Sequence, residues 1–154
     1  IGAINLFPSY FEFEQFGHDY AIRIIKNAKA LARELFIRDV AVLCPHKDFT
    51  ESHTVLIDAK LDANYVVKLL ESARIITNAF QLPWNEEDKP TGIRLGTNEL
   101  TRLGMKESEM KHIANLIASV LLKRKSAKKV EQEVRNLRAS YQKIGYCFES
   151  NILN

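Results

Sequence analysis

"TGIRLGTNELTRLGMKESEMKHIANLI" (residues 91–117) decides the fold, because it places a short apolar strand, turn glycines and an amphipathic helix in direct succession. In its first part, Ile93 and Leu95 alternate with Arg94, which is the period-2 pattern of a strand with one buried face. If the two apolar side chains face a core, Arg94 faces the opposite side of the strand.

Arg94 is therefore the first candidate for a functional residue. Gly92 and Gly96 bracket it and allow a close backbone approach or a tight turn. A guanidinium on a stiff strand can bind a carboxylate through two parallel hydrogen bonds, which a lysine cannot reproduce. The alternative, which composition alone favours, is a surface arginine that pairs with a neighbouring acid.

The rest of the chain alternates between helical and strand-like periodicity. A spacing of three to four residues between apolar positions predicts helices over 11–36, 62–73, about 106–123, and from about 126 to 141. Runs rich in β-branched or apolar residues predict strands over 39–44, 53–59, 74–77 and 93–96. The segment 78–92 has no period and contains two prolines, so it is predicted to be a loop.

This order of elements predicts an α/β fold in which helices cover one face of a small antiparallel or mixed sheet. The length of 154 residues predicts a single domain, 1–154. Its expected parts are a long connecting helix over 1–36, the sheet with one helix and a loop over 37–104, and C-terminal helices over 105–154. Neither GxGxxG nor GxxxxGK[ST] occurs, so the usual phosphate-binding loops are absent.

The composition is that of an ordinary soluble protein, with 46% apolar and 27% charged residues and a net charge of +3. A local basic excess has no interleaved aromatic residue, so a solvated helix junction is favoured over nucleic-acid binding. It comprises Lys123, Arg124, Lys125, Lys128 and Lys129. No apolar run approaches the length of a membrane span and no leader pattern is present, so a cytoplasmic location without membrane contact is expected.

No catalytic side chain or metal site is predicted from the histidines and cysteines. His18, His46, His53 and His112 each stand alone in their segments, without metal-ligand spacing or the order of a catalytic triad. Cys44 and Cys147 lack CxxC spacing and are expected to be buried, reduced and inert.

The run 91–117 resembles the C-terminal signature of the serine hydroxymethyltransferases. That signature is a Ser- or Thr-Gly-Ile-Arg-hydrophobic-Gly-Thr run, followed by Thr-Arg-x-Gly-Met/Phe-Lys-Glu, and "RLGTNELTRLGMKESEM" is most similar to the archaeal form. Three further stretches are similar to the family's helix leaving the large domain, its Asn-His-hydrophobic-Asp strand and its Asn-rich loop. They are "FEQFGHDYAIRIIKNAKALARELF", "SHTVLIDA" and "TNAFQLP". The resemblance covers nearly the whole chain.

The resemblance implies the C-terminal domain of a pyridoxal-phosphate enzyme of the aspartate aminotransferase-like fold, fold type I. Such enzymes move a one-carbon unit between serine and a tetrahydropterin, leaving glycine. Arg94 matches the arginine that binds the substrate's carboxylate. The resemblance further implies a homodimer, a large catalytic domain as partner, and amino-acid and pterin substrates. The residues expected on the pterin side are Phe80, Gln81, Leu82, Pro83 and Trp84.

The family's Schiff-base lysine lies in the large domain, after a Thr-rich, His-containing stretch, and no lysine here has such surroundings. Lys26 and Lys29 lie on a predicted helix face, while Lys106 and Lys111 follow the "RLG" turn. The complete enzyme is thus expected to bind pyridoxal phosphate, whereas this chain alone should neither bind it stably nor catalyse the reaction.

The sequence departs from the family pattern in the loop. Phe80 stands where many bacterial and eukaryotic members have a second Asn, two positions after the one matching Asn78. The shorter "EEDKPT" replaces their Ser-Pro-Phe segment. Both differences put ordinary folate recognition in doubt and leave room for a modified pterin carrier, so tetrahydrofolate and tetrahydromethanopterin both stay open.

Two other functions remain open. The first is a different fold-type-I activity, such as threonine aldol cleavage or amino-acid decarboxylation, which would use Arg94 in the same way. The second is a non-catalytic binding or assembly module, which the missing lysine and the basic helices suggest. The chain begins with Ile1 and not Met, which predicts a processed or partial chain and disfavours the module.

Overall fold

The computed structural model describes residues 6–86 and 88–148, with side chains from Tyr10 onward. Its helices and strands follow in the order α1 (Leu6–Phe36), a 3₁₀ turn (Pro45–Lys47), β1 (Thr54–Asp58), α2 (Ala63–Ser72), β2 (Asn78–Phe80), β3 (Gly92–Gly96), α3 (Asn98–Arg102), α4 (Glu107–Leu121) and α5 (Ala127–Ala139). The predicted α/β class is confirmed, and the sheet is antiparallel.

The strand β3 lies at the centre of the sheet, whose order is β1-β3-β2. Ile93 and Leu95 of β3 are 0% and 3% exposed, which confirms that they face the core. Arg94 is exposed and lies between Leu56 of β1 and Asn78 of β2 in the antiparallel register. Paired residues share a face of the sheet, so the opposite side from the core, here called the Arg94 face, is defined by the register. It consists of Thr54, Leu56, Asp58, Asn78, Phe80, Gly92, Arg94 and Gly96.

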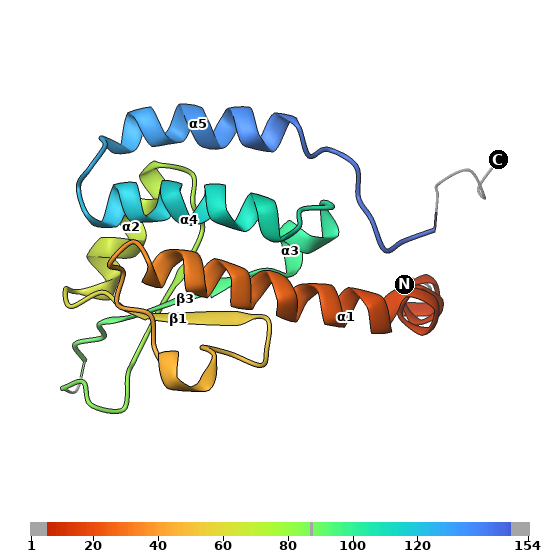
Figure 1. The fold of residues 1–154 in the computed structure, drawn as a ribbon, viewed down its shortest axis with the longest axis horizontal. Helices are drawn as coiled ribbons and strands as arrows, with labels where there is room; N and C mark the ends of the chain where they lie inside the picture. The colour runs from red at the N-terminus through yellow and green to blue at the C-terminus, as the bar shows by residue number, and fades with distance from the viewer. Residues whose placement is uncertain (1–5, 87, 149–154) are drawn as a thin grey trace.

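The helices supply the other wall of the core. α4 packs between the long helix α1 and α5, and α2 lies against β2 and β3 (Figure 1). The buried side chains of α1 recur at the predicted spacing, and α4 contributes a matching stripe. They are Ile24, Ala28, Leu31, Ala32 and Leu35 in α1, and Met110, Ala114 and Ile117 in α4. The helix α2 is capped by Asp62, the first residue of the helix predicted over 62–73, which accepts a hydrogen bond from the Asn64 backbone N–H at 2.9 Å.

The strand predicted over 39–44 is wrong. This segment contributes only an isolated bridge between Val42 and Ile57. Asp39 and Cys44 have left-handed backbone with φ of 68° and 56°, which ends any extended run at both sides. Cys44 is consequently exposed, which corrects the prediction of a buried thiol, while Cys147 is half-buried.

The strand predicted over 74–77 and the loop predicted over 78–92 are also wrong in their boundaries. Arg74, with φ of 60°, turns the chain at the end of α2, so the extended backbone begins later and pairs with β3 as Asn78–Phe80. The short helix α3 was not predicted, because its five residues are too few to show a helical period.

A buried polar cluster joins α1 to the turn that follows β3. The Thr97 hydroxyl donates to the Ile24 carbonyl at 3.1 Å, and the Asn27 amide donates to Thr101 Oγ1 and to the Met105 carbonyl, both at 2.9 Å. Thr97, Asn27 and Thr101 are each 0% exposed. Because no water reaches them, these bonds fix how the strand enters the helical layer.

Gly104 ends α3. Its φ of 83° is left-handed, its N–H bonds the Thr101 carbonyl, and the Met105 N–H bonds the Leu100 carbonyl. This is a Schellman motif, which favours glycine because a Cβ is strained in that conformation.

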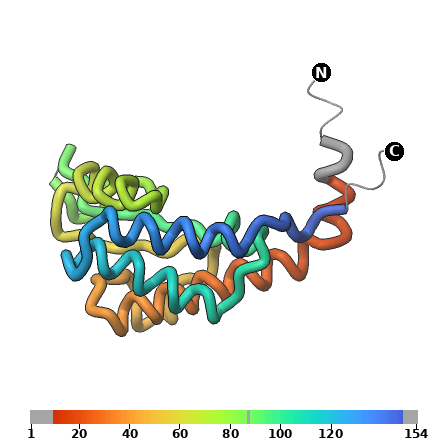
Figure 2. The backbone as a smooth tube through the Cα atoms, turned by 90° about the horizontal axis from the view of Figure 1, so that it is seen from above, coloured from red at the N-terminus to blue at the C-terminus, as the bar shows by residue number. Residues whose placement is uncertain are grey.

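The segment after α5 returns along the first half of α1 (Figure 2). The Gly145 N–H bonds the Arg102 carbonyl, and Tyr146 packs on Tyr20 with ring centroids 4.8 Å apart. Two ends of the described chain therefore support each other.

We expect Asn27→Ala to lower the free energy of unfolding by about 1–3 kcal/mol, because it removes two buried hydrogen bonds and leaves the Thr101 hydroxyl oxygen and the Met105 carbonyl without this donor. Urea unfolding followed by circular dichroism measures the change. Lys26→Ala, at the neighbouring exposed position of α1, is the control. Equal stability of the two variants would contradict a structural role for the cluster.

Candidate functional site

Arg94 sits at the middle of the central strand, with a hydrogen-bonded strand on either side. Within residues 10–86 and 88–148, its guanidinium has neither a hydrogen bond nor an ion pair. Pairing with a neighbouring acid, the alternative from composition, is therefore absent from the described part of the chain. The side chain presents a full positive charge and free N–H donors on the Arg94 face.

Phe80 is the side chain that contacts the guanidinium. Arg94 Cζ lies over the Phe80 ring, 6.0 Å from its centroid, at the distance of a cation–π interaction. Phe80 pairs with Gly92 in the register, and its ring occupies the space that a side chain at Gly92 would need. A Cβ added there would lie 2.5 Å from the ring and 2.7 Å from the Phe80 carbonyl oxygen.

The predicted pterin-side residues lie where β2 leads into the following loop. Asn85 organises this loop, since its Oδ1 accepts from the Leu82 and Thr91 backbone N–H groups at 2.9 Å and its amide donates to Thr91 Oγ1. Leu82 is 2% exposed and anchors the loop, whereas Trp84 is 61% exposed. Gln81 and Pro83 are exposed as well.

Two acids of the segments that flank the strands are paired with lysines, namely Asp58 at the end of β1 and Glu86 in the loop before β3. Lys60 Nζ lies 2.5 Å from Asp58 Oδ2, and Lys89 Nζ lies 2.5 Å from Glu86 Oε2. Burial opposes ionisation of Asp58, but hydrogen bonds from Lys60 and Thr91 outweigh it and hold the pKa of that carboxyl below its ordinary value. The Asp58 carboxyl is therefore ionised at neutral pH and cannot donate a proton there.

The described residues offer few other groups for catalysis or metal binding. No group of three or more His, Cys, Asp or Glu is arranged to hold a metal ion in that part of the chain. All four histidines are exposed, and the Arg94 face carries neither a lysine nor a histidine. A membrane-spanning helix is likewise not found among the described residues.

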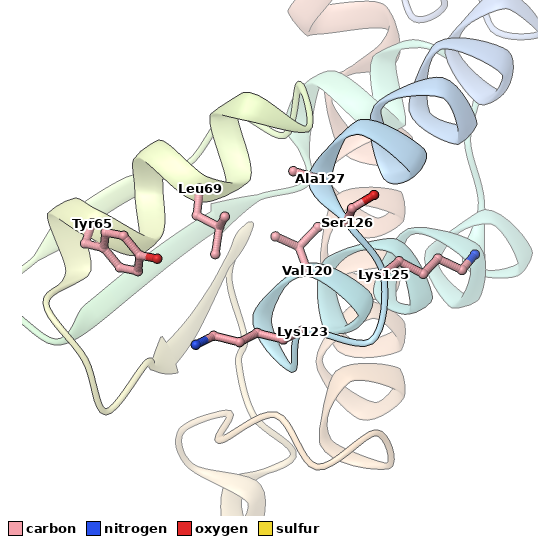
Figure 3. Close-up of a pocket in the computed structure, with 7 residues that line it drawn as sticks. All are labelled: Tyr65, Leu69, Val120, Lys123, Lys125, Ser126 and Ala127. Carbon is pink, nitrogen blue, oxygen red and sulfur yellow. The ribbon is translucent and has the colours of Figure 1, made fainter.

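A hollow with a volume of about 310 Å³ lies between α2 and the α4–α5 junction, away from the Arg94 face. Leu69 and Val120 face each other across it, and the Lys125 amine points away, toward Glu133 at 2.6 Å (Figure 3). The basic excess is exposed at this junction, as expected for a solvated turn. The Arg94 face, which combines an unpaired cation with an ordered loop, is the stronger candidate site.

The fold defines the class of protein. The chain superposes on an L-threonine transaldolase from Pseudomonas fluorescens, solved in its internal aldimine state, with a TM-score of 0.85 and 30% identity. The match covers 94% of this chain and 34% of that one. Helices packed on a small antiparallel sheet thus form the C-terminal domain architecture of the fold-type-I pyridoxal-phosphate enzymes.

Sequence comparison then gives the family. The serine hydroxymethyltransferase family model matches residues 11–117. Serine hydroxymethyltransferases of Methanopyrus kandleri and Methanocaldococcus jannaschii are 45% and 46% identical over 146 and 147 residues. These matches cover 92% and 90% of this chain, which spans 34% of each relative's length. The chain belongs to the serine hydroxymethyltransferase family.

The sequence pattern singled out Arg94 as a candidate, but it did not indicate the residues that arrange its surroundings. Asn85 could have been suspected, because Asn commonly organises turns through its side chain. The contact of Phe80 with Gly92 and Arg94 had no signal in the sequence, since it depends on the register between β2 and β3.

We expect Gly92→Ala to destabilise the protein by about 1–3 kcal/mol, because the new Cβ meets both the Phe80 ring and its carbonyl oxygen. Gly96→Ala, on the same strand and face, is the matched control, since its Cβ meets nothing within 4 Å. It should be neutral or slightly stabilising. Thermal unfolding of the two variants tests the difference, and equal melting temperatures would refute it.

We expect Asp58 to make stability depend on pH at the acid end. The pKa of Asp58 is lower in the folded protein than in the unfolded chain, where it is about 4. Its contribution to the free energy of unfolding is therefore present above the unfolded pKa and is lost as the pH falls through the folded pKa. Urea unfolding between pH 6 and 3 should show the advantage of the native protein over Asp58→Asn disappearing below about pH 4. Asp19→Asn, at an exposed site, serves as control. An advantage that stays constant with pH would exclude this role.

Proposed function

We propose that this chain is the C-terminal domain of a serine hydroxymethyltransferase that interconverts serine and glycine and transfers the one-carbon unit to a tetrahydropterin. Family membership supports the proposal, as does the chain's span of 34% of its relatives' length, which leaves room for a large catalytic domain. The observation that carries it is Arg94, an unpaired cation at the centre of the sheet.

In this proposal Arg94 binds the carboxylate of serine or glycine. The guanidinium has donors in a planar fork, so it can bind both carboxylate oxygens and orient the amino acid as well as hold it. The strand keeps the Arg94 backbone fixed, because β3 is bonded on both sides. Less conformational freedom is then lost when the substrate binds.

The reactive centre lies outside this chain in the proposal. Bound pyridoxal phosphate supplies the electron sink for reaction at the amino acid's α carbon. The described residues do not suit its attachment: the Arg94 face has no lysine, and the nearby Lys60 and Lys89 are ion-paired, with 73% and 74% of their side chains exposed. The large domain of a cytoplasmic homodimer would supply the lysine, and this chain alone would be inactive.

The loop after β2 forms the pterin side of the proposed site. Leu82 and Asn85 hold the loop in shape, which leaves Gln81, Pro83 and Trp84 as exposed surface toward a ligand. Trp84 offers an aromatic face on which a pterin ring can stack. Phe80 in place of an Asn removes a hydrogen-bonding group there, which favours a modified pterin over ordinary folate.

A second candidate is an aldolase-type reaction on threonine. The likeness to an L-threonine transaldolase supports it at 30% identity, below the 45–46% shared with the serine hydroxymethyltransferases. Arg94 would hold the carboxylate in both reactions. Product analysis separates them: formation of glycine from serine that requires a tetrahydropterin favours the first, and pterin-independent cleavage of threonine favours the second.

In the complete enzyme, we expect Arg94→Ala to raise the Kd for glycine and the KM for serine, because a charge-assisted grip worth about 1.5–3 kcal/mol is lost. Arg94→Lys should recover only part of this, since an ammonium group cannot make the paired contact. Calorimetric titration with glycine measures the effect. Unchanged amino-acid affinity in Arg94→Ala would exclude the carboxylate role.

A further inference from the structure

We infer that Phe80 is a positioning residue for Arg94: its ring holds the guanidinium in place while leaving every N–H donor free for the carboxylate. This inference rests on the proposed function, since it specifies how the carboxylate-binding group is oriented. It begins from the contact of Arg94 Cζ with the Phe80 ring, 6.0 Å from the ring centroid.

The register of the sheet creates this contact. Asn78 pairs with Arg94 and Phe80 pairs with Gly92, so Phe80 is the diagonal neighbour of Arg94 on the same face. Diagonal neighbours on adjacent strands are within reach of aromatic and long side chains. Asn78, the direct neighbour, makes no side-chain hydrogen bond within the described residues, so it does not bind the guanidinium.

Gly92 allows the ring to take this position. The ring atoms of Phe80 lie 2.5 and 2.7 Å from the place of a Cβ at Gly92, so any side chain there would push the ring away. Gly96, at the other end of the same strand, has open space around it. A residue without a Cβ is thus required at position 92, beside the Phe80 ring, and not at position 96.

An aromatic face suits this task better than an acid or an amide. A carboxylate would occupy the N–H donors of Arg94 and neutralise its charge, and the substrate would then have to displace it. The negative face of a ring attracts the cation through its π electrons and takes up no hydrogen bond. Arg94 therefore stays charged and unpaired, while its attraction to the ring favours one position of its side chain.

The test uses the complete enzyme with three substitutions. Phe80→Leu keeps an apolar side chain but removes the π face, and Phe80→Tyr restores the face. Phe36→Leu is the matched control, because it removes an aromatic ring that packs on Phe49 at the end of α1, outside the proposed site. For each variant, the Kd of glycine and of glycinamide, the KM and kcat for serine, and the melting temperature are measured.

We expect Phe80→Leu to weaken glycine binding and to raise the KM for serine roughly three- to thirty-fold, the range that corresponds to a cation–π interaction. Glycinamide, which has no carboxylate, should bind the variant as it binds the native enzyme. Phe80→Tyr should behave like the native protein, and Phe36→Leu should leave both affinities unchanged.

The outcomes separate this inference from the proposed function. If Phe80→Leu weakens glycine and glycinamide equally, or if Phe80→Tyr fails to restore affinity, Phe80 acts only as a packing residue and the inference is wrong. The same holds if Phe80→Leu binds glycine normally while Arg94→Ala does not, in which case the proposed function stands. If Arg94→Ala itself binds glycine normally, the proposed function fails.

Discussion

The structure depends on one constraint: the central strand β3 buries the side chains of one face in the core and exposes Arg94 on the other. Ile93 and Leu95 are buried under the helices, and the side-chain alternation of a strand then forces Arg94 to the other side. A shift of one residue in the register would bury the guanidinium and expose the two apolar side chains. The register that buries Ile93 and Leu95 is therefore also the one that exposes Arg94.

The buried polar cluster transmits this constraint to the helices. Thr97 directly follows β3 and is bonded to the Ile24 carbonyl of α1, and Asn27 bonds Thr101 and Met105 beyond it. These groups are shielded from water, so losing a partner costs the full desolvation penalty. The long helix and the strand that carries Arg94 are consequently held in one arrangement.

The charges around Arg94 explain why it is suited to bind an anion. Asp58, on the same face of the sheet, is paired with Lys60, and Glu86, in the loop before β3, is paired with Lys89, so neither of these two acids is free to neutralise the guanidinium. Phe80 contacts it without taking up its donors. The strand residues that form this face include neither a lysine nor a histidine.

The sequence by itself determined the helices α1, α2, α4 and α5, the strand around Arg94 and the family, because periodicity and short motifs are local properties of the chain. It predicted a strand over 39–44 that does not form and placed the strand after α2 too early, because left-handed residues turn the backbone at both places. The polar cluster and the Phe80 contact were decided only by tertiary structure. Asn27 and Thr101 are 74 positions apart, and Phe80 meets Arg94 through strand register. Neither relation leaves a periodic signal in the sequence, because each arises only when separate segments pack together.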